Sequence, residues 1–117
     1  MNAGQRRVVL LSAVTVDETQ SLPVDVSAYR YHTVYLKSVG TTSGGNITIE
    51  EADWDGLSEV PYGGTWSIVG TAVAASTFTG GATIAVRLPV GAYAWLRVRL
   101  SDAITGGGTV SASLRSA

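Results

Sequence analysis

Residues 94–100 read Ala-Trp-Leu-Arg-Val-Arg-Leu, and this stretch decides the fold class. Its apolar residues recur at every second position, so that Ala94, Leu96, Val98 and Leu100 share one face. Because successive side chains of an extended strand point to opposite faces of a sheet, the stretch predicts a strand with one buried and one solvent-facing side. Such one-sided burial is typical of antiparallel sheets.

The same alternation recurs in three further stretches, at 31–39, 83–88 and 109–115, and glycine-rich turns separate the runs. No window carries apolar residues at helical spacing over three turns. Strands are predicted near 6–16, 22–26, 31–39, 46–53, 65–71, 74–79, 82–88, 92–101 and 108–115. Seven to nine short strands predict an all-β, antiparallel β-sandwich of jelly-roll or immunoglobulin-like topology.

The composition sets limits on function. The chain has 117 residues, which suits a single domain spanning 1–117, with 0 Cys and 1 His. The lack of cysteine excludes a disulfide scaffold, a thiolate zinc site and a thiol nucleophile, and it fits synthesis in a reducing cytosol. A net charge of -1 gives no electrostatic footprint for nucleic acid. We expect no cofactor, no metal and no membrane span, because the longest apolar run covers only 8–11.

The first predicted strand is unusual because both of its faces are apolar. Val8 and Leu10 alternate with Val9 and Leu11. A strand that is apolar on both faces is either covered twice within its own domain or lies against another chain. Residues 1–16 are therefore predicted to form either a covered strand or an arm that packs on a neighbouring subunit.

The strand near 92–101 presents a second candidate interface. If its apolar residues point inward, then Tyr93, Trp95, Arg97 and Arg99 point outward in one line. Tyr, Trp and Arg dominate binding hot spots, so we predict that this line contacts another protein. The alternative is a local cation–π pair in which the Trp95 ring lies over the stem of Arg97.

Catalytic signals are weak. His32 is the only imidazole, and no Gly-x-Ser-x-Gly elbow accompanies it, so a structural role at a strand end is predicted. An acidic cluster comprises Glu50, Glu51, Asp53, Asp55 and Glu59. The Asp53-x-Asp55-Gly56 spacing weakly resembles a calcium loop, but the further ligands do not follow. Solvated acids at strand ends and turns are the preferred interpretation.

Aromatic residues near the acidic cluster give an alternative function. Trp54 and Tyr62 lie in a predicted loop, where they could stack on a sugar ring, whereas Trp66 is predicted to be in the core. These residues support the hypothesis of a carbohydrate- or receptor-binding module.

Two stretches carry a resemblance to a known class of proteins. Ile47-Thr-Ile-Glu-Glu-Ala-Asp-Trp-Asp-Gly56 resembles a strand and Asp-Gly segment of small virion proteins of tailed bacteriophages. The stretch 93–114, with its Trp-Leu-Arg-Val-Arg strand, Gly-Gly-Gly turn and Thr-Val-rich last strand, resembles their C-terminal hairpin. The resemblance covers roughly 30–117.

This resemblance implies a non-enzymatic structural protein that is made in the host bacterial cytoplasm and located in the virion. It implies a capsid decoration (cement) protein first, or a tail- or neck-associated protein. The partners would be other virion proteins, namely the major capsid protein or tail and neck components, and further copies of the chain in a homo-oligomer. It transfers no catalytic residues to this sequence.

Overall fold

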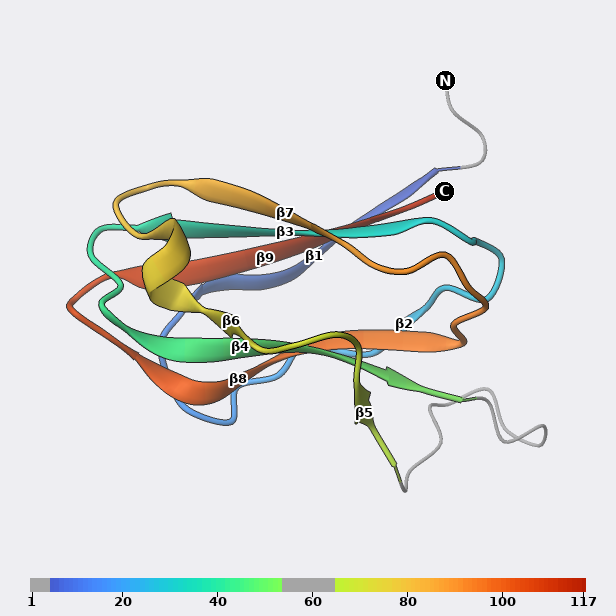
Figure 1. Ribbon diagram of the computed structural model, residues 1–117, viewed down its shortest axis with the longest axis horizontal. Coiled ribbons are helices and arrows are strands. Elements are labelled where there is room, and N and C mark those ends of the chain that lie inside the picture. Colours follow the sequence, from blue (N-terminus) through green and yellow to red (C-terminus); the bar gives the residue numbers. More distant parts are fainter. Residues whose placement is uncertain (1–4, 54–64) are drawn as a thin grey trace.

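Two antiparallel sheets packed face to face make up the protein, whose computed structural model describes residues 5–53 and 65–117 (Figure 1). The first sheet has the order β1-β9-β3-β7 and consists of β1 (Arg6–Val14), β9 (Thr109–Ser116), β3 (His32–Val39) and β7 (Thr83–Arg87). The second sheet has the order β2-β8-β4-β5 and consists of β2 (Val24–Asp25), β8 (Trp95–Thr105), β4 (Gly44–Ala52) and β5 (Ser67–Ile68), with β6 (Val73–Ala74) also paired to β4. The predicted antiparallel β-sandwich is confirmed.

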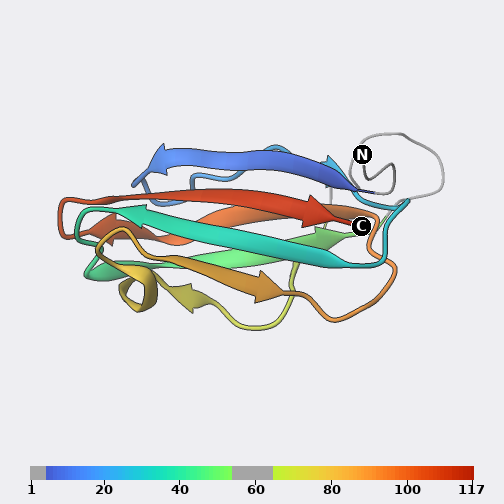
Figure 2. The ribbon, with the colours of Figure 1, turned by 90° about the horizontal axis from the view of Figure 1, so that it is seen from above.

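The strand order identifies the topology. Early strands pair with late ones, because β1 pairs with β9, β2 with β8 and β3 with β7, while β4 pairs with β5 and β6. The chain is thus a long antiparallel hairpin wound into two sheets, which is the jelly-roll arrangement. Figure 2 shows the first sheet from above, with β1 and β7 at its two edges. Of the two topologies that the sequence left open, the structure has the jelly roll.

The core lies between the sheets and is built from the alternating positions that the sequence indicated. On β8, Leu96, Val98 and Leu100 are all 1% exposed or less. From the other layer, Leu36 and Leu114 reach the same core. Among the described residues no helix is both long and apolar enough to cross a membrane.

β1 departs from regular alternation. It is the edge strand of the first sheet, and its register with β9 shifts between Val9 and Leu11 and again between Leu11 and Val14. The first bulge inserts Leu10 as an extra residue, so that Leu11 turns inward opposite the buried Ala112. The apolar character of both faces is therefore explained in part by a bulge, and the interpretation of β1 as a strand covered twice is wrong.

The predicted strand at 74–79 is also wrong, because only Ala74 of this range lies in a strand. After β6 the chain forms a 3₁₀ helix, η1 (Ala75–Phe78), which leads into β7. Two buried hydroxyl groups hold it: Ser38 donates to the carbonyl of Phe78, and Thr42 donates to the carbonyl of Ala75 at 2.9 Å. The fully buried Phe78 ring fills the core at this side of the sandwich, so packing overrides the local strand propensity.

Candidate functional site

The outer face of the first sheet carries a row of arginines. Arg7 lies directly opposite Arg115, Arg115 lies opposite Thr33, and Thr33 lies opposite Arg87. This row crosses all four strands. Neighbouring strands are about 4.8 Å apart, so the three arginines line one band across the sheet.

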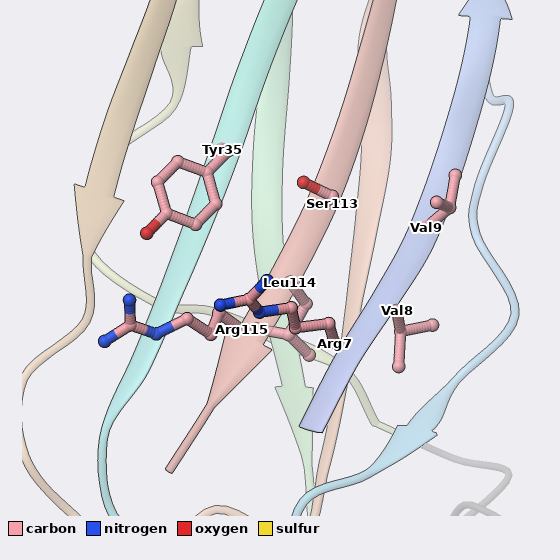
Figure 3. Close-up of a pocket in the computed structure, with 7 residues that line it drawn as sticks. All are labelled: Arg7, Val8, Val9, Tyr35, Ser113, Leu114 and Arg115. Carbon is pink, nitrogen blue, oxygen red and sulfur yellow. The ribbon is translucent and has the colours of Figure 1, made fainter. Parts of the chain in front are cut away.

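The next row of the same face is aromatic and apolar. Val9 lies opposite Ser113, which lies opposite Tyr35. Figure 3 shows these three side chains on adjacent strands, with Arg7 and Arg115 extending side by side in the neighbouring row. Together they line an open hollow of about 440 Å³. Tyr and Arg are enriched at binding hot spots, and Tyr35, Arg7 and Arg115 all line this hollow.

The predicted N-terminal interface is only partly available to a partner. Leu11 is 5% exposed and belongs to the core, while Val8 and Leu10 pack partly against it. Val9 is 75% exposed on the outer face. Because β1 pairs with β9 of the same sheet, residues 6–14 form part of the domain and do not extend away as an arm. Of these four candidates, Val9 alone lies fully open to contact.

The arginines of β8 are occupied within the protein. Arg97 Nε lies 2.8 Å from Glu50 Oε1, and Arg99 Nε lies 3.1 Å from Glu50 Oε2. Arg99 also contacts both carboxylate oxygens of Glu18 at 3.0 Å. The hydrogen bond that Arg99 donates to Glu50 is the largest cause that raises the pKa of Arg99. Arg97 and Arg99 do point outward with Trp95, as predicted, but they hold the second sheet together across β8 and β4.

Trp66 corrects two expectations. It was predicted in the core, yet it lies half-buried on the outer side of the second sheet. The Arg97 guanidinium lies 4.2 Å from the centroid of its ring. The cation–π partner of Arg97 is therefore Trp66, from beyond β4, and not Trp95 from its own strand. Arg97 and Trp66 are far apart in the chain, so no local sequence pattern indicated their contact.

Tyr93 does not share the outward line of β8. It precedes β8, and its ring meets the ring of His32 edge-on, with centroids 5.4 Å apart. The Tyr93 hydroxyl donates to the carbonyl of Pro89 at 3.0 Å. Burial and the nearby Glu51 raise the pKa of Tyr93. Tyr93 closes one end of the sandwich because the chain has not yet entered the regular alternation of the strand.

His32 is a buried structural residue. Its Nδ1 lies 2.7 Å from Ser116 Oγ, and both residues are 3% exposed or less. Burial lowers the pKa of His32, against a smaller opposing effect of the Tyr29 backbone. Its Nε2 has no hydrogen-bond partner among the described residues. A nucleophile hidden this deeply cannot reach a substrate, so this pair stabilises the end of the sheet.

The acidic cluster is divided by the fold. Glu50 faces its two arginines, whereas burial, and then the neighbouring Asp53, raise the pKa of Glu51. Within 5–53 and 65–117, no group of three or more His, Cys, Asp or Glu residues could hold a metal ion. Asp55 and Glu59 lie outside the described residues, and so do Trp54 and Tyr62 of the carbohydrate hypothesis.

Sequence reasoning missed most of the hollow. Tyr35, Ser113 and Arg115 occupy the polar positions of alternating strands, so their outward direction could be read from the sequence. Their alignment could not, because β3 and β9 are far apart in the chain and only their register brings Tyr35 beside Ser113.

Comparison with known proteins gives a likeness in structure only. No protein-family model matches the chain, and no curated protein matches it. Among solved structures, the coat protein of Tobacco streak virus aligns with 100% of this chain and 88% of its own at 12% identity, but its TM-score of 0.35 is too low to support an argument. The SPBc2 prophage-derived protein YomS aligns with a TM-score of 0.61 and 13% identity over 96% of this chain and 91% of that chain. The chain therefore shares its fold with YomS.

Proposed function

We propose that the chain is a non-enzymatic structural protein of a bacteriophage virion, and specifically a capsid decoration (cement) protein. A position in the tail or neck is the alternative placement. Two independent considerations support a phage setting: the sequence resemblance to small virion proteins, and a fold shared with a prophage-derived protein. Because one fold serves many functions, the site must carry the rest of the argument.

The observation that carries the proposal is the outer face of the first sheet. Val9 is 75% exposed there and shares a hollow with Tyr35, Arg7 and Arg115. Tyr and Arg are enriched in protein-binding hot spots, and here they surround an exposed apolar side chain. It lies on a rigid sheet, so binding would cost little ordering of the backbone.

The side chains that could in principle act in catalysis support a role without it. His32 and Ser116 are buried together at the end of the sheet. The Glu50 carboxylate is 4% exposed and bound by Arg97 and Arg99. These side chains stabilise the sandwich, and such fully engaged, solvent-shielded groups are poor acids, bases or nucleophiles.

The experiment is to locate the chain in particles and then to test the surface. Quantitative mass spectrometry of density-purified phage particles should find the chain at many copies per capsid. Purified chain should also bind in trans to capsids that lack it. Val9→Asp should abolish this binding, whereas Val90→Asp, at a loop residue that is 65% exposed, should not.

The outcomes separate the possibilities. Absence of the chain from particles would overturn the virion proposal. Recovery only with separated tails would replace decoration by a tail role. Equal binding by the wild type and Val9→Asp would show that the hollow is not the binding surface.

A further inference from the structure

The charges of this protein are divided between its two sheets. The strands of the first sheet carry five basic residues and no acidic residue: Arg6, Arg7, Lys37, Arg87 and Arg115. The strands of the second sheet carry Asp25, Glu50, Glu51 and Asp102 against Arg97 and Arg99. A chain with a net charge of -1 is thus strongly polarised from one layer to the other.

Salt bridges within the second sheet increase the difference in exposed charge between the two sheets. Both arginines of the second sheet are bound to Glu50, and Arg99 is bound to Glu18 as well. Among the described residues, the exposed acidic side chains on this side outside these salt bridges are Asp17, Asp25, Asp53 and Asp102, of which Asp25 lies beside Arg6 of the first sheet. Asp17 belongs to this side because the next residue, Glu18, donates its backbone N–H to the carbonyl of Leu100 on β8 at 3.0 Å.

Arg6 donates to the carbonyl of Asp25 on β2 at 2.8 Å. The basic residues on the outer face of the first sheet have no such compensation. Among the described residues, no salt bridge involves the basic residues on its outer face. Arg7 and Arg115 lie directly opposite each other, and like charges in this position destabilise a sheet. Carboxylates brought by a partner would relieve this repulsion. The chain itself carries a matching set on its opposite side.

We propose that copies of this chain associate head to tail, with the outer face of the first sheet of one copy docked on the acidic side of the second sheet of the next. This contact joins two different surfaces, so repetition produces a ring or a stack. The inference deepens the proposed function by naming a second copy as a partner of the same face. In an open stack this face of the end copy stays free for the capsid. The inference rests on the proposed function only for its biological setting.

The test is the self-association of the full chain. Sedimentation velocity should show oligomers at about 20 mM NaCl that dissociate at about 500 mM, because salt screens exposed charges. Arg115→Glu should weaken association at least about tenfold at low salt, since like charges across an interface cost several kcal/mol. Arg30→Glu makes the same change of charge at an exposed loop residue outside the first sheet and should leave association unchanged.

Charge exchange adds a test that loss of folding cannot mimic. The double variant Asp17→Arg/Asp102→Arg reverses the acidic side and should also associate weakly alone. Mixed with Arg115→Glu, it should form complexes, because each variant then offers the surface that the other lacks. Circular dichroism of each variant should match that of the wild type.

Three results would overturn the inference: a monomer at every salt concentration, equal effects of Arg115→Glu and Arg30→Glu, or no complex in the mixture. A monomeric chain that is nevertheless found in particles would retain the proposed function and assign the basic face to the acidic surface of another virion protein. Salt-sensitive oligomers of a chain absent from particles would retain this inference and reject the virion role.

Discussion

Glu50 is a buried carboxylate that forms ion pairs with two arginines. It is 4% exposed and contacts the guanidinium groups of Arg97 and Arg99, whose side chains are 15% and 22% exposed. Burying a charge is costly unless its partners remain in place. The network therefore couples β4 to β8 on the side of the sheet that faces away from the core.

Replacing this carboxylate should destabilise the fold. Glu50→Gln leaves Arg97 without its counter-charge and leaves Arg99 with only the exposed Glu18. We therefore expect the free energy of unfolding to fall by about 2 kcal/mol in urea denaturation. The control is Glu18→Gln, which removes a pair whose carboxylate is 67% exposed. That change should cost less than about 0.5 kcal/mol. Equal losses in the two variants would contradict this assignment.

His32 should make stability depend on pH. Burial lowers its folded-state pKa below the ordinary histidine value of about 6.5. The unfolded chain therefore takes up a proton first as the pH falls through 6.5, and stability present above that pH is lost toward the lowered pKa. The neighbouring Tyr93 stays neutral in this range.

The measurement is urea denaturation of the wild type and His32→Asn at several pH values from about 7.5 to 5.5. Asparagine can still hydrogen-bond Ser116 but does not titrate. The wild type should lose stability over this range, and the variant should lose less. The raised pKa of Glu51 acts in the opposite direction. Both proteins contain Glu51, so the comparison of the wild type with His32→Asn removes its contribution. Parallel curves would exclude His32 as the cause.

At the level of single elements, β1 illustrates how an edge strand is kept in place. Its two irregularities interrupt a continuous row of backbone groups, which blunts uncontrolled pairing at the edge of the sheet. The second irregularity places Ala13 at φ 51°. The Ala13 N–H donates a hydrogen bond to Ser111 Oγ at 2.9 Å. An alanine in this left-handed region is strained.

Glycine should relieve that strain. Ala13→Gly retains the N–H that donates to Ser111, and we expect it to raise the free energy of unfolding by about 0.5 kcal/mol after the greater entropy of the unfolded chain is included. Ala85→Gly, at a regular position of β7, should instead lower it by about 0.5–1 kcal/mol. Chemical denaturation measures both, and the same sign for the two variants would contradict the backbone argument.

For the molecule as a whole, one core joins both sheets. Leu36 of β3 and Leu100 of β8 belong to the same buried cluster, to which η1 adds Phe78. Each sheet needs the other to exclude water from its apolar inner face. We therefore expect a single cooperative unfolding transition.

Two probes can check this cooperativity. Tryptophan fluorescence includes Trp66 and Trp95 at the second sheet, whereas far-ultraviolet circular dichroism reports both sheets. Their urea midpoints should coincide. An earlier transition in fluorescence would show that the second sheet opens on its own.

Local pattern was sufficient for the fold class and for the inward face of most strands. The alternation in 94–100 correctly assigned Leu96, Val98 and Leu100 to the core, because a strand's side-chain period is a property of neighbouring residues. The same rule gave the outward direction of Tyr35 and Arg115. It failed at β1, where a bulge breaks the period.

Pairing between distant residues required the folded chain. Glu50 meets Arg97 across 47 residues and His32 meets Ser116 across 84 residues, and no local pattern encodes either register. The jelly-roll order, the arginine row and the separation of charge between the layers follow from the same long-range pairing. The amino-acid sequence sets which side of a strand is apolar, whereas burial of those sides against one another selects which strands become neighbours.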